Sequence, residues 1–300
     1  MERLMLFILW TWFSPALGKF GRALEVISGF VHGVGATLTN WTVAPGDSLA
    51  IRSFDVSKKA LLLDIWALND TAAGVLTVHS PRMHDNVDAI WNRITNNDTE
   101  PLLSGAGTSM FAQRLYAQDL LIAQQSGSAA NYDSGHLVIL YDDLPGVAAR
   151  FIDNASLMAN GVNRIGQEVA LTLAGAVAGY QGAAAINSSF DNLKANTDYA
   201  LLGATTDVRC GVVGIRGADS GNLRIPMPAE PAQRHMCCNW FQRLTDAYGQ
   251  PLIPVFNSAN KNAFLIDGTG QTGALSPIVT LNLVELAARS GASSGGQYGV

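Results

Sequence analysis

The pattern of hydrophobic and polar positions predicts many short strands separated by turns. Residues 60–67 form a run with the length and apolar content of a buried strand, and residues 74–78 and 136–141 are shorter β-rich runs. Clusters of Asn, Asp, Pro and Gly lie between the runs, for example at residues 44–47 and 96–99. Long helical patterns do not alternate with these runs, so the sequence predicts an all-β fold and not an α/β fold.

The same pattern continues along the rest of the chain. Strands are also predicted at residues 37–43 and 114–123, and in the second part at residues 169–173, 199–204, 208–215, 222–227, 251–256, 263–267 and 277–284. Residues 237–248 are predicted to form a short helix, because Trp240, Phe241, Leu244 and Tyr248 fall near one helical face. Residues 84–95 are its expected counterpart in the first part.

The two parts of the chain resemble each other at a period of about 150 residues, far longer than a solenoid repeat of about 20–50. Trp91-Asn-Arg-Ile-Thr95 resembles Phe241-Gln-Arg-Leu-Thr245, and Glu100-Pro-Leu-Leu103 resembles Gln250-Pro-Leu-Ile253. Weaker matches in the same order join residues 73–78 to 220–225, 47–51 to 198–202, and 24–26 to 167–169. This order of matches predicts a tandem duplication of a domain-sized unit.

The predicted organisation is therefore two tandem, related β-sandwich or jelly-roll domains with short helices. The expected segments are an apolar N-terminal segment at 1–21, a first sandwich at 22–150, a polar, Asn-rich connector at 151–166, a second sandwich at 167–289, and a flexible Gly- and Ser-rich tail at 290–300.

Charge is scarce in this chain. Asp, Glu, Lys and Arg make up 14% of residues, whereas about 25% is usual. The 19 basic and 24 acidic residues form no long run of either sign, which argues against a dedicated nucleic-acid binder. A low charged fraction indicates surface that is committed to an assembly, a membrane or a matrix.

The N-terminus is apolar and carries two alternative interpretations. Residues 4–13 are apolar, one Arg precedes them, and residues 16–18 have a small-x-small pattern typical of a cleaved secretory signal. Alternatively the segment is retained and contacts a membrane or a neighbouring subunit. In that case the expected contact residues are the large apolar ones, since aromatic rings suit such boundaries: Leu6, Phe7, Trp10, Trp12 and Phe13.

No catalytic, cofactor-binding or metal-binding constellation is found in the sequence. The five histidines have no metal-ligand spacing; they are His32, His79, His84, His136 and His235. Residues 217–221 lack the spacing of a nucleophile elbow, and Asp142-Asp143 are interpreted as turn residues rather than as a glycosidase pair. The expectation is a protein that is not an enzyme and has no cofactor.

Two further features leave alternatives open. Cys210 could form a disulfide with Cys237 or Cys238, although buried small hydrophobic residues are the simpler interpretation. Asn-x-Ser/Thr sequons begin at five positions and indicate either glycosylation in a secreted protein or ordinary turn composition: Asn40, Asn69, Asn97, Asn154 and Asn187.

Over residues 22–290 this pattern resembles the double jelly-roll major capsid proteins of icosahedral viruses, including membrane-containing phages. The resemblance implies two related eight-stranded barrels in each subunit, a trimer with a pseudo-sixfold outline, and an N-terminal segment that reaches an internal membrane or a neighbour. It also implies a virion location, with other virion proteins and further copies of the chain as partners.

The resulting hypothesis is a structural virion protein, a capsid subunit that self-assembles through large low-charge interfaces. One alternative is a secreted or surface-exposed binding module, such as an adhesin, spike or decoration protein, with a cleaved signal peptide. A carbohydrate-active enzyme on a jelly-roll scaffold is a third alternative, and the sequence offers no carboxylate pair for it.

Overall fold

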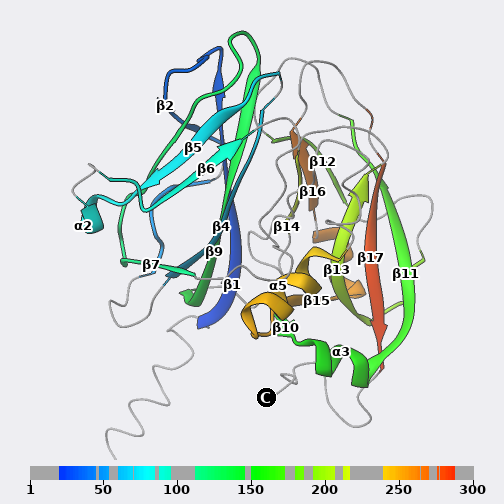
Figure 1. Cartoon of the computed structure of the whole chain (residues 1–300). Coiled ribbons are helices and arrows are strands. Elements are labelled where there is room, and N and C mark those ends of the chain that lie inside the picture. Colours follow the sequence, from blue (N-terminus) through cyan, green and yellow to red (C-terminus); the bar gives the residue numbers. More distant parts are fainter. Residues whose placement is uncertain are drawn as a thin grey trace, which may run out of the picture.

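The computed structural model describes residues 20–44, 47–53, 60–69, 71–84, 88–95, 112–145, 150–172, 180–185, 192–206, 212–216, 239–263, 265–269, 276 and 278–287. These residues fold mainly into antiparallel strands with short helices, which confirms the predicted all-β class. Residues 20–145 are called the first half and residues 150–287 the second half (Figure 1).

The first half contains two sheets. The five-stranded sheet has the order β3-β1-β9-β4-β7, and the four-stranded sheet has the order β2-β8-β5-β6. The elements are β1 (Phe20–His32), β2 (Thr39–Asn40), β3 (Thr42–Val43), β4 (Ala60–Leu68), β5 (Gly74–His79), α2 (Pro81–His84), β6 (Trp91–Thr95), β7 (Gln113–Leu115), β8 (Ile122–Gln125) and β9 (Tyr132–Pro145).

The second half also contains a large and a small sheet. Its five-stranded sheet has the order β10-β15-β13-β17-β11, and its three-stranded sheet has the order β12-β16-β14. The elements are β10 (Arg150–Ile152), α3 (Asn154–Asn160), β11 (Gly161–Ala170), β12 (Tyr180–Ala185), β13 (Asp198–Thr206), β14 (Val212–Arg216), α5 (Trp240–Tyr248), β15 (Ile253–Asn257), η2 (Ser258–Ala263), β16 (Leu265–Thr269) and β17 (Ile278–Leu286).

The two halves share one strand order. The large sheets contain the corresponding orders β1-β9-β4-β7 and β11-β17-β13-β15. In both, the last strand of the half (β9 or β17) lies between the first long strand (β1 or β11) and a strand from the middle of the half (β4 or β13). A strand that comes later in the sequence (β7 or β15) pairs with the other side of this middle strand. The small sheets agree in the same way, since β2-β8-β5 corresponds to β12-β16-β14. All these pairings are antiparallel.

Bulges strengthen this correspondence, because a bulge is a local feature that strand order alone does not require. Each large sheet has one register shift near the start of its first long strand and another in its middle strand. The residues that flank these shifts are Gly21/Ala23 and Leu62/Asp64 in the first half, and Gly161/Asn163 and Leu201/Gly203 in the second. The two large sheets therefore agree in strand order and in the places where their pairing is interrupted.

Of the sequence matches that suggested a repeat, the one between residues 24–26 and 167–169 lies in the equivalent strands β1 and β11, whereas two others do not occupy equivalent places. Trp91–Thr95 is strand β6, whereas residues 241–245 lie in helix α5. Residues 47–51 form a loop with one isolated β-bridge, whereas residues 198–202 are the first residues of strand β13. These matches were wrong because short apolar blocks recur in any all-β chain. The matches involving residues 220–225 and 100–103 lie outside the described residues.

Several other predictions are confirmed or corrected by the strand bounds. Strands predicted at 60–67 and 199–204 coincide with β4 and β13, and the helix predicted at 237–248 is α5. The strand predicted at 114–123 is two strands, β7 and β8, because Gln118 adopts a positive φ of 57° in a turn between them. The helix predicted at 84–95 was wrong. Helix α2 ends at His84, and residues 91–95, which were predicted to be the end of that helix, form strand β6.

The stretch predicted as a connector contains regular elements. Residues 151–166 include the end of β10, helix α3 and the first part of β11. Helix α3 begins where it does because the Asp153 side chain accepts a hydrogen bond from the Ser156 backbone N at 2.7 Å, a standard N-cap. The Asn-rich composition therefore marks a helix with its cap and the edge strand that follows it.

The five-stranded sheet of the first half is buried on both faces. Residues of one face pack inside the first half, among them Ile27, Leu62 and Ile139. Residues of the other face belong to a core shared with the second half: Leu24, Val26, Leu63, Val138 and Leu140. Burial on both faces explains why β4 reads as one apolar run instead of an alternating strand.

Candidate functional sites

Helix α5 lies between the two large sheets (Figure 1). Trp240 and Phe241 are fully buried, with ring centroids 4.9 Å apart in an edge-to-face arrangement, and both belong to the shared core. The Tyr248 hydroxyl, at the end of the helix, donates a hydrogen bond to the Leu63 backbone O at the bulge of β4. The helix thus connects the second half to the outer face of the first-half sheet.

In each half, a basic residue on the loop that precedes the middle strand (β4 or β13) contacts one Glu and one Tyr. We call this arrangement a polar clamp. In the first half the Arg52 guanidinium lies 2.5 Å from the Glu25 carboxylate, and the Arg52 backbone N lies 3.5 Å from the Tyr141 hydroxyl. Glu25 and Tyr141 are buried on β1 and β9. The basic residue therefore fixes the loop at residues 47–53 through both its backbone and its side chain.

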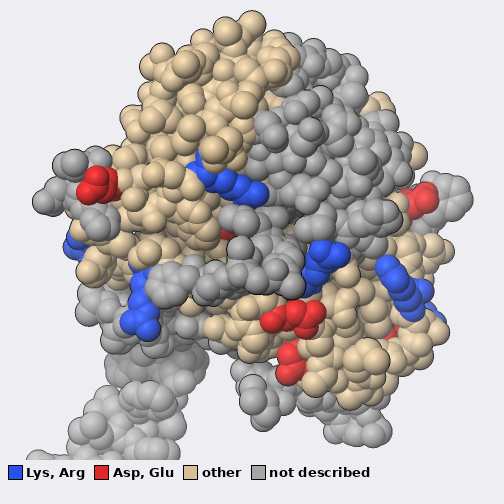
Figure 2. Space-filling view, in the orientation of Figure 1, with Lys and Arg blue, Asp and Glu red and all other residues tan. Residues whose placement is uncertain are grey.

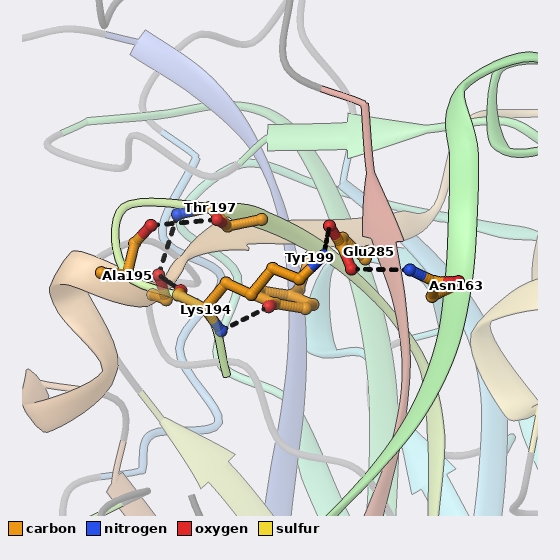
Figure 3. Close-up of polar contacts among 7 residues, drawn as sticks. Asn163, Lys194, Ala195, Thr197, Tyr199 and Glu285 are labelled. Atoms are coloured by element: carbon orange, nitrogen blue, oxygen red, sulfur yellow. Dashed lines mark hydrogen bonds and ion pairs between the residues drawn. The ribbon is translucent and has the colours of Figure 1, made fainter. Parts of the chain in front are cut away.

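In the second half the basic residue of the clamp is Lys194 (Figure 3). Its ammonium lies 2.6 Å from Glu285 of β17, and its backbone N donates to the Tyr199 hydroxyl at 2.8 Å. Asn163 of β11 donates a second hydrogen bond to Glu285, at 3.1 Å. Ser258 completes the arrangement by donating to the Lys194 backbone O at 2.7 Å. The recurring set is one basic residue, one Glu and one Tyr.

The two carboxylates have opposite electrostatic environments. Burial raises the pKa of Glu25, because desolvation outweighs the opposing charge and hydrogen bond of Arg52, and the nearby Asp47 carboxylate raises it further. Hydrogen bonds from Lys194 and Asn163 instead hold the pKa of Glu285 below its usual range. The contact with Glu285 raises the pKa of Lys194. The two clamps should therefore respond to pH with opposite signs.

We expect Glu25→Gln to remove a pH-dependent contribution to stability. The folded chain retains the Glu25 proton to a higher pH than the unfolded chain does, so this contribution is full below the ordinary pKa of 4.5 and is lost as pH rises through the raised value. The free energy of unfolding of the wild type minus that of the variant should fall as pH rises above 4.5. Urea unfolding across this range measures it, and a difference that rises with pH contradicts the assignment.

Ser28 and His136 form a hydrogen-bonded pair that their spacing in the sequence could not predict, because they lie on two separate strands, β1 and β9. Ser28 Oγ and His136 Nδ1 are 2.9 Å apart, and the Trp66 ring lies 4.8 Å from the imidazole. A Ser–His contact is one element of nucleophilic catalysis. Here Ser28 is 2% exposed and His136 is 0% exposed, so the pair is inaccessible to a substrate in this arrangement and joins the two strands.

The other predicted candidates are placed as follows. His32 stacks on Tyr132 at the end of β1, with centroids 4.3 Å apart, and His79 ends β5. Asp142 and Asp143 are in strand β9, not in a turn as predicted, because pairing with β1 continues to Pro145. Within the described ranges no three His, Cys, Asp or Glu residues are grouped as metal ligands.

The remaining candidates fall outside the described residues, so their roles stay predictions. These are the predicted contact residues Leu6, Phe7, Trp10, Trp12 and Phe13, together with His235, the three cysteines and residues 217–221.

The sequons differ in accessibility. Asn69 is fully buried, and its Nδ2, the atom that a glycan would modify, donates to the Ala72 backbone O at 2.8 Å. A glycan at Asn69 is therefore incompatible with this fold. Asn40 is exposed and Asn154 is half-buried, whereas Asn97 and Asn187 lie outside the described residues.

Neither a known protein family nor a curated protein matches the chain. Across the described part, no helix is long and apolar enough to cross a membrane. Charged side chains are scattered on the visible surface and gather into no single-sign patch among the described residues (Figure 2).

Proposed function

We propose that this chain is a structural virion protein, a capsid subunit of the double jelly-roll type that assembles with copies of itself. The observation that carries the proposal is strand order. With the short β3 set aside, the first half has eight strands, and its sheets run 1-8-3-6 and 2-7-4-5 along that count. We interpret this as the order of a jelly roll, and with β10 set aside the described strands of the second half, β11 to β17, follow the same scheme.

Two further properties support an assembling subunit. The halves share a core through one face of the first-half sheet, so the subunit would act as one rigid block. Only 14% of its residues are charged, and extensive interfaces are depleted of charge at their centres. A chain that remained a free monomer would be expected to carry more surface charge.

The proposed partners are further copies of the chain, in a trimer within a shell, together with other virion proteins. The apolar residues of 1–18 are proposed to contact a membrane or a neighbouring subunit, and no specific nucleic acid is expected to bind. A secreted adhesin or spike is the competing interpretation, in which residues 1–18 are removed and the mature chain stays monomeric.

Sedimentation velocity of the purified full-length chain over a wide concentration range tests the proposal. We expect trimers or larger particles at micromolar concentration, with residues 1–18 retained as judged by intact mass. A mature chain that begins near Lys19 and sediments as a monomer at every concentration would overturn the capsid proposal and favour the secreted module.

A further inference from the structure

We propose that the outer face of the four-stranded sheet in the first half is a contact surface for a second copy of the chain. This proposal rests on the proposed function, since the contact would be one of those that build the assembly. The outer face is defined by strand alternation: Leu76 and Val78 of β5 point into the core, so Val75, Thr77 and His79 point outward.

The register of the strands places four uncharged hydrogen-bonding side chains in one row. The pairs Asn40–Gln124, Gln124–Thr77 and Thr77–Asn92 lie directly opposite one another on neighbouring strands, so the row crosses β2, β8, β5 and β6. Within the row the Gln124 amide donates to Asn40 Oδ1 at 2.9 Å. Thr77 is 6% exposed, so the accessible polar groups of the row are the amides of Asn40, Gln124 and Asn92.

Apolar side chains flank the row on both sides, accompanied on one side by the half-buried His79. Val75 lies opposite Ile94 on one side, and His79 lies opposite Ile122 on the other. Ile94 is 79% exposed, and Leu120, two residues before Ile122 in the same alternation, is 61% exposed. These are two of the most exposed large hydrophobic side chains in the described part of the chain.

The outward positions of this face carry no Asp, Glu, Lys or Arg: Asn40, Val75, Thr77, His79, Asn92, Ile94, Leu120, Ile122 and Gln124. A monomer surface would usually have about 25–35% charged residues. In Figure 2 the upper left of the molecule, over β2 and β5, is a continuous uncharged area with charged side chains along its lower border. The face therefore has the composition of an interface centre and not of a solvated sheet.

Strand β6, at the edge of this sheet, has no outward charge, Pro or bulge among the described residues, and its protection is limited to its short length and one inward-pointing charge. Outward charges, Pro, bulges, short length and inward-pointing charges all protect edge strands from further pairing. The one charged residue of β6, Arg93, turns inward and donates to the Ile65 backbone O at 2.8 Å. The outward residues of the strand are Asn92 and Ile94, and within the described residues β6 pairs with β5 alone.

A second copy fits this face because the face is complementary to itself. Each Asn or Gln side chain carries both a donor and an acceptor. A twofold axis that lays the row across its own copy therefore pairs amides with amides in either direction, with the apolar flanks packed beside them. A strongly charged partner would find no opposite charge here. Since a stable interface needs about 20–30 residues a side, this face would be its centre.

Matched lysine substitutions test the proposal. Ile94→Lys places a charge on the face, and Met158→Lys places the same charge on helix α3, where Met158 is 81% exposed compared with 79% for Ile94. Gln124→Glu is a second variant, which breaks the amide row with no change in side-chain shape. All three should keep the wild-type melting temperature within a few degrees, because the substituted side chains are not in the core.

Sedimentation velocity of the full-length variants gives the result. We expect Ile94→Lys and Gln124→Glu to raise the concentration for half-assembly at least tenfold and Met158→Lys to leave it unchanged. If the wild type assembles and all three variants assemble equally well, or are weakened equally, the contact surface is wrong while the proposed function stands. If the wild type itself is monomeric, the proposed function fails, and the contact surface fails with it.

Discussion

Replacing Phe241 with alanine is expected to lower the free energy of unfolding by about 3–5 kcal/mol, the range for removing a large buried aromatic side chain. Phe241 is 0% exposed and packs edge-to-face on Trp240 in helix α5. It belongs to the core that also contains Leu63 and Val138 of the first half. The loss should therefore destabilise the two halves together, as a single unfolding transition at lower denaturant concentration.

Guanidinium unfolding followed by far-UV and near-UV circular dichroism provides the measurement. Met158→Ala is the matched control, because Met158 is 81% exposed on a neighbouring helix and should change stability by less than about 0.5 kcal/mol. Two separate transitions in the Phe241→Ala protein, with one left at its wild-type position, would contradict a core shared by both halves.

Replacing Gly135 with alanine is expected to be the second large effect, at about 3 kcal/mol, the upper end for overpacking a core. Gly135 and Gly29 lie opposite each other on β9 and β1, and the Trp41 indole covers both. A Cβ on Gly135 would lie 2.1 Å from Trp41 Cζ2. The indole cannot shift freely, because its Nε1 donates to Gln125 at 3.0 Å.

A double-mutant cycle identifies the cause of this effect. In a Trp41→Ala background, Gly135→Ala should lose most of its effect, because the nearest remaining neighbour of the added Cβ is the flexible Gln125 side chain, with Oε1 at 2.9 Å. The two changes should therefore be non-additive by about 2–3 kcal/mol. Gly166→Ala is the control, since a Cβ at this strand glycine meets its nearest neighbour, Thr280 Cγ2, at 3.4 Å. Additive losses at Trp41 and Gly135 would show that the indole does not lie over the glycine pair.

The sequence predicted the elements that depend on local pattern. Buried runs such as residues 60–67 became β4, and the one-sided apolar pattern at Trp240, Phe241 and Leu244 became α5. Strand β1 was missed because burial on both faces removes alternation, and Glu25, Ser28 and Gly29 interrupt its apolar run. Burial on two faces is a tertiary property that a local window does not contain.

The polar clamps and the uncharged face could not be predicted from the sequence. The Arg52–Glu25 and Lys194–Glu285 contacts join residues that are 27 and 91 positions apart, and the composition near each residue is ordinary. The row from Asn40 to Asn92 exists only through strand register, which a single-residue slip would reverse. The low total charge was the one signal in the sequence that pointed toward such a surface.

Electron microscopy of the assembled full-length protein tests the capsid proposal. We expect a closed ring of three subunits in which each chain contributes two β-sandwiches, so that six similar lobes surround the axis. We also expect the four-stranded sheet of the first half to lie at a twofold contact between subunits of two neighbouring rings. Isolated two-lobed particles at all concentrations, with that sheet facing solvent, would contradict both the capsid proposal and the proposed contact surface.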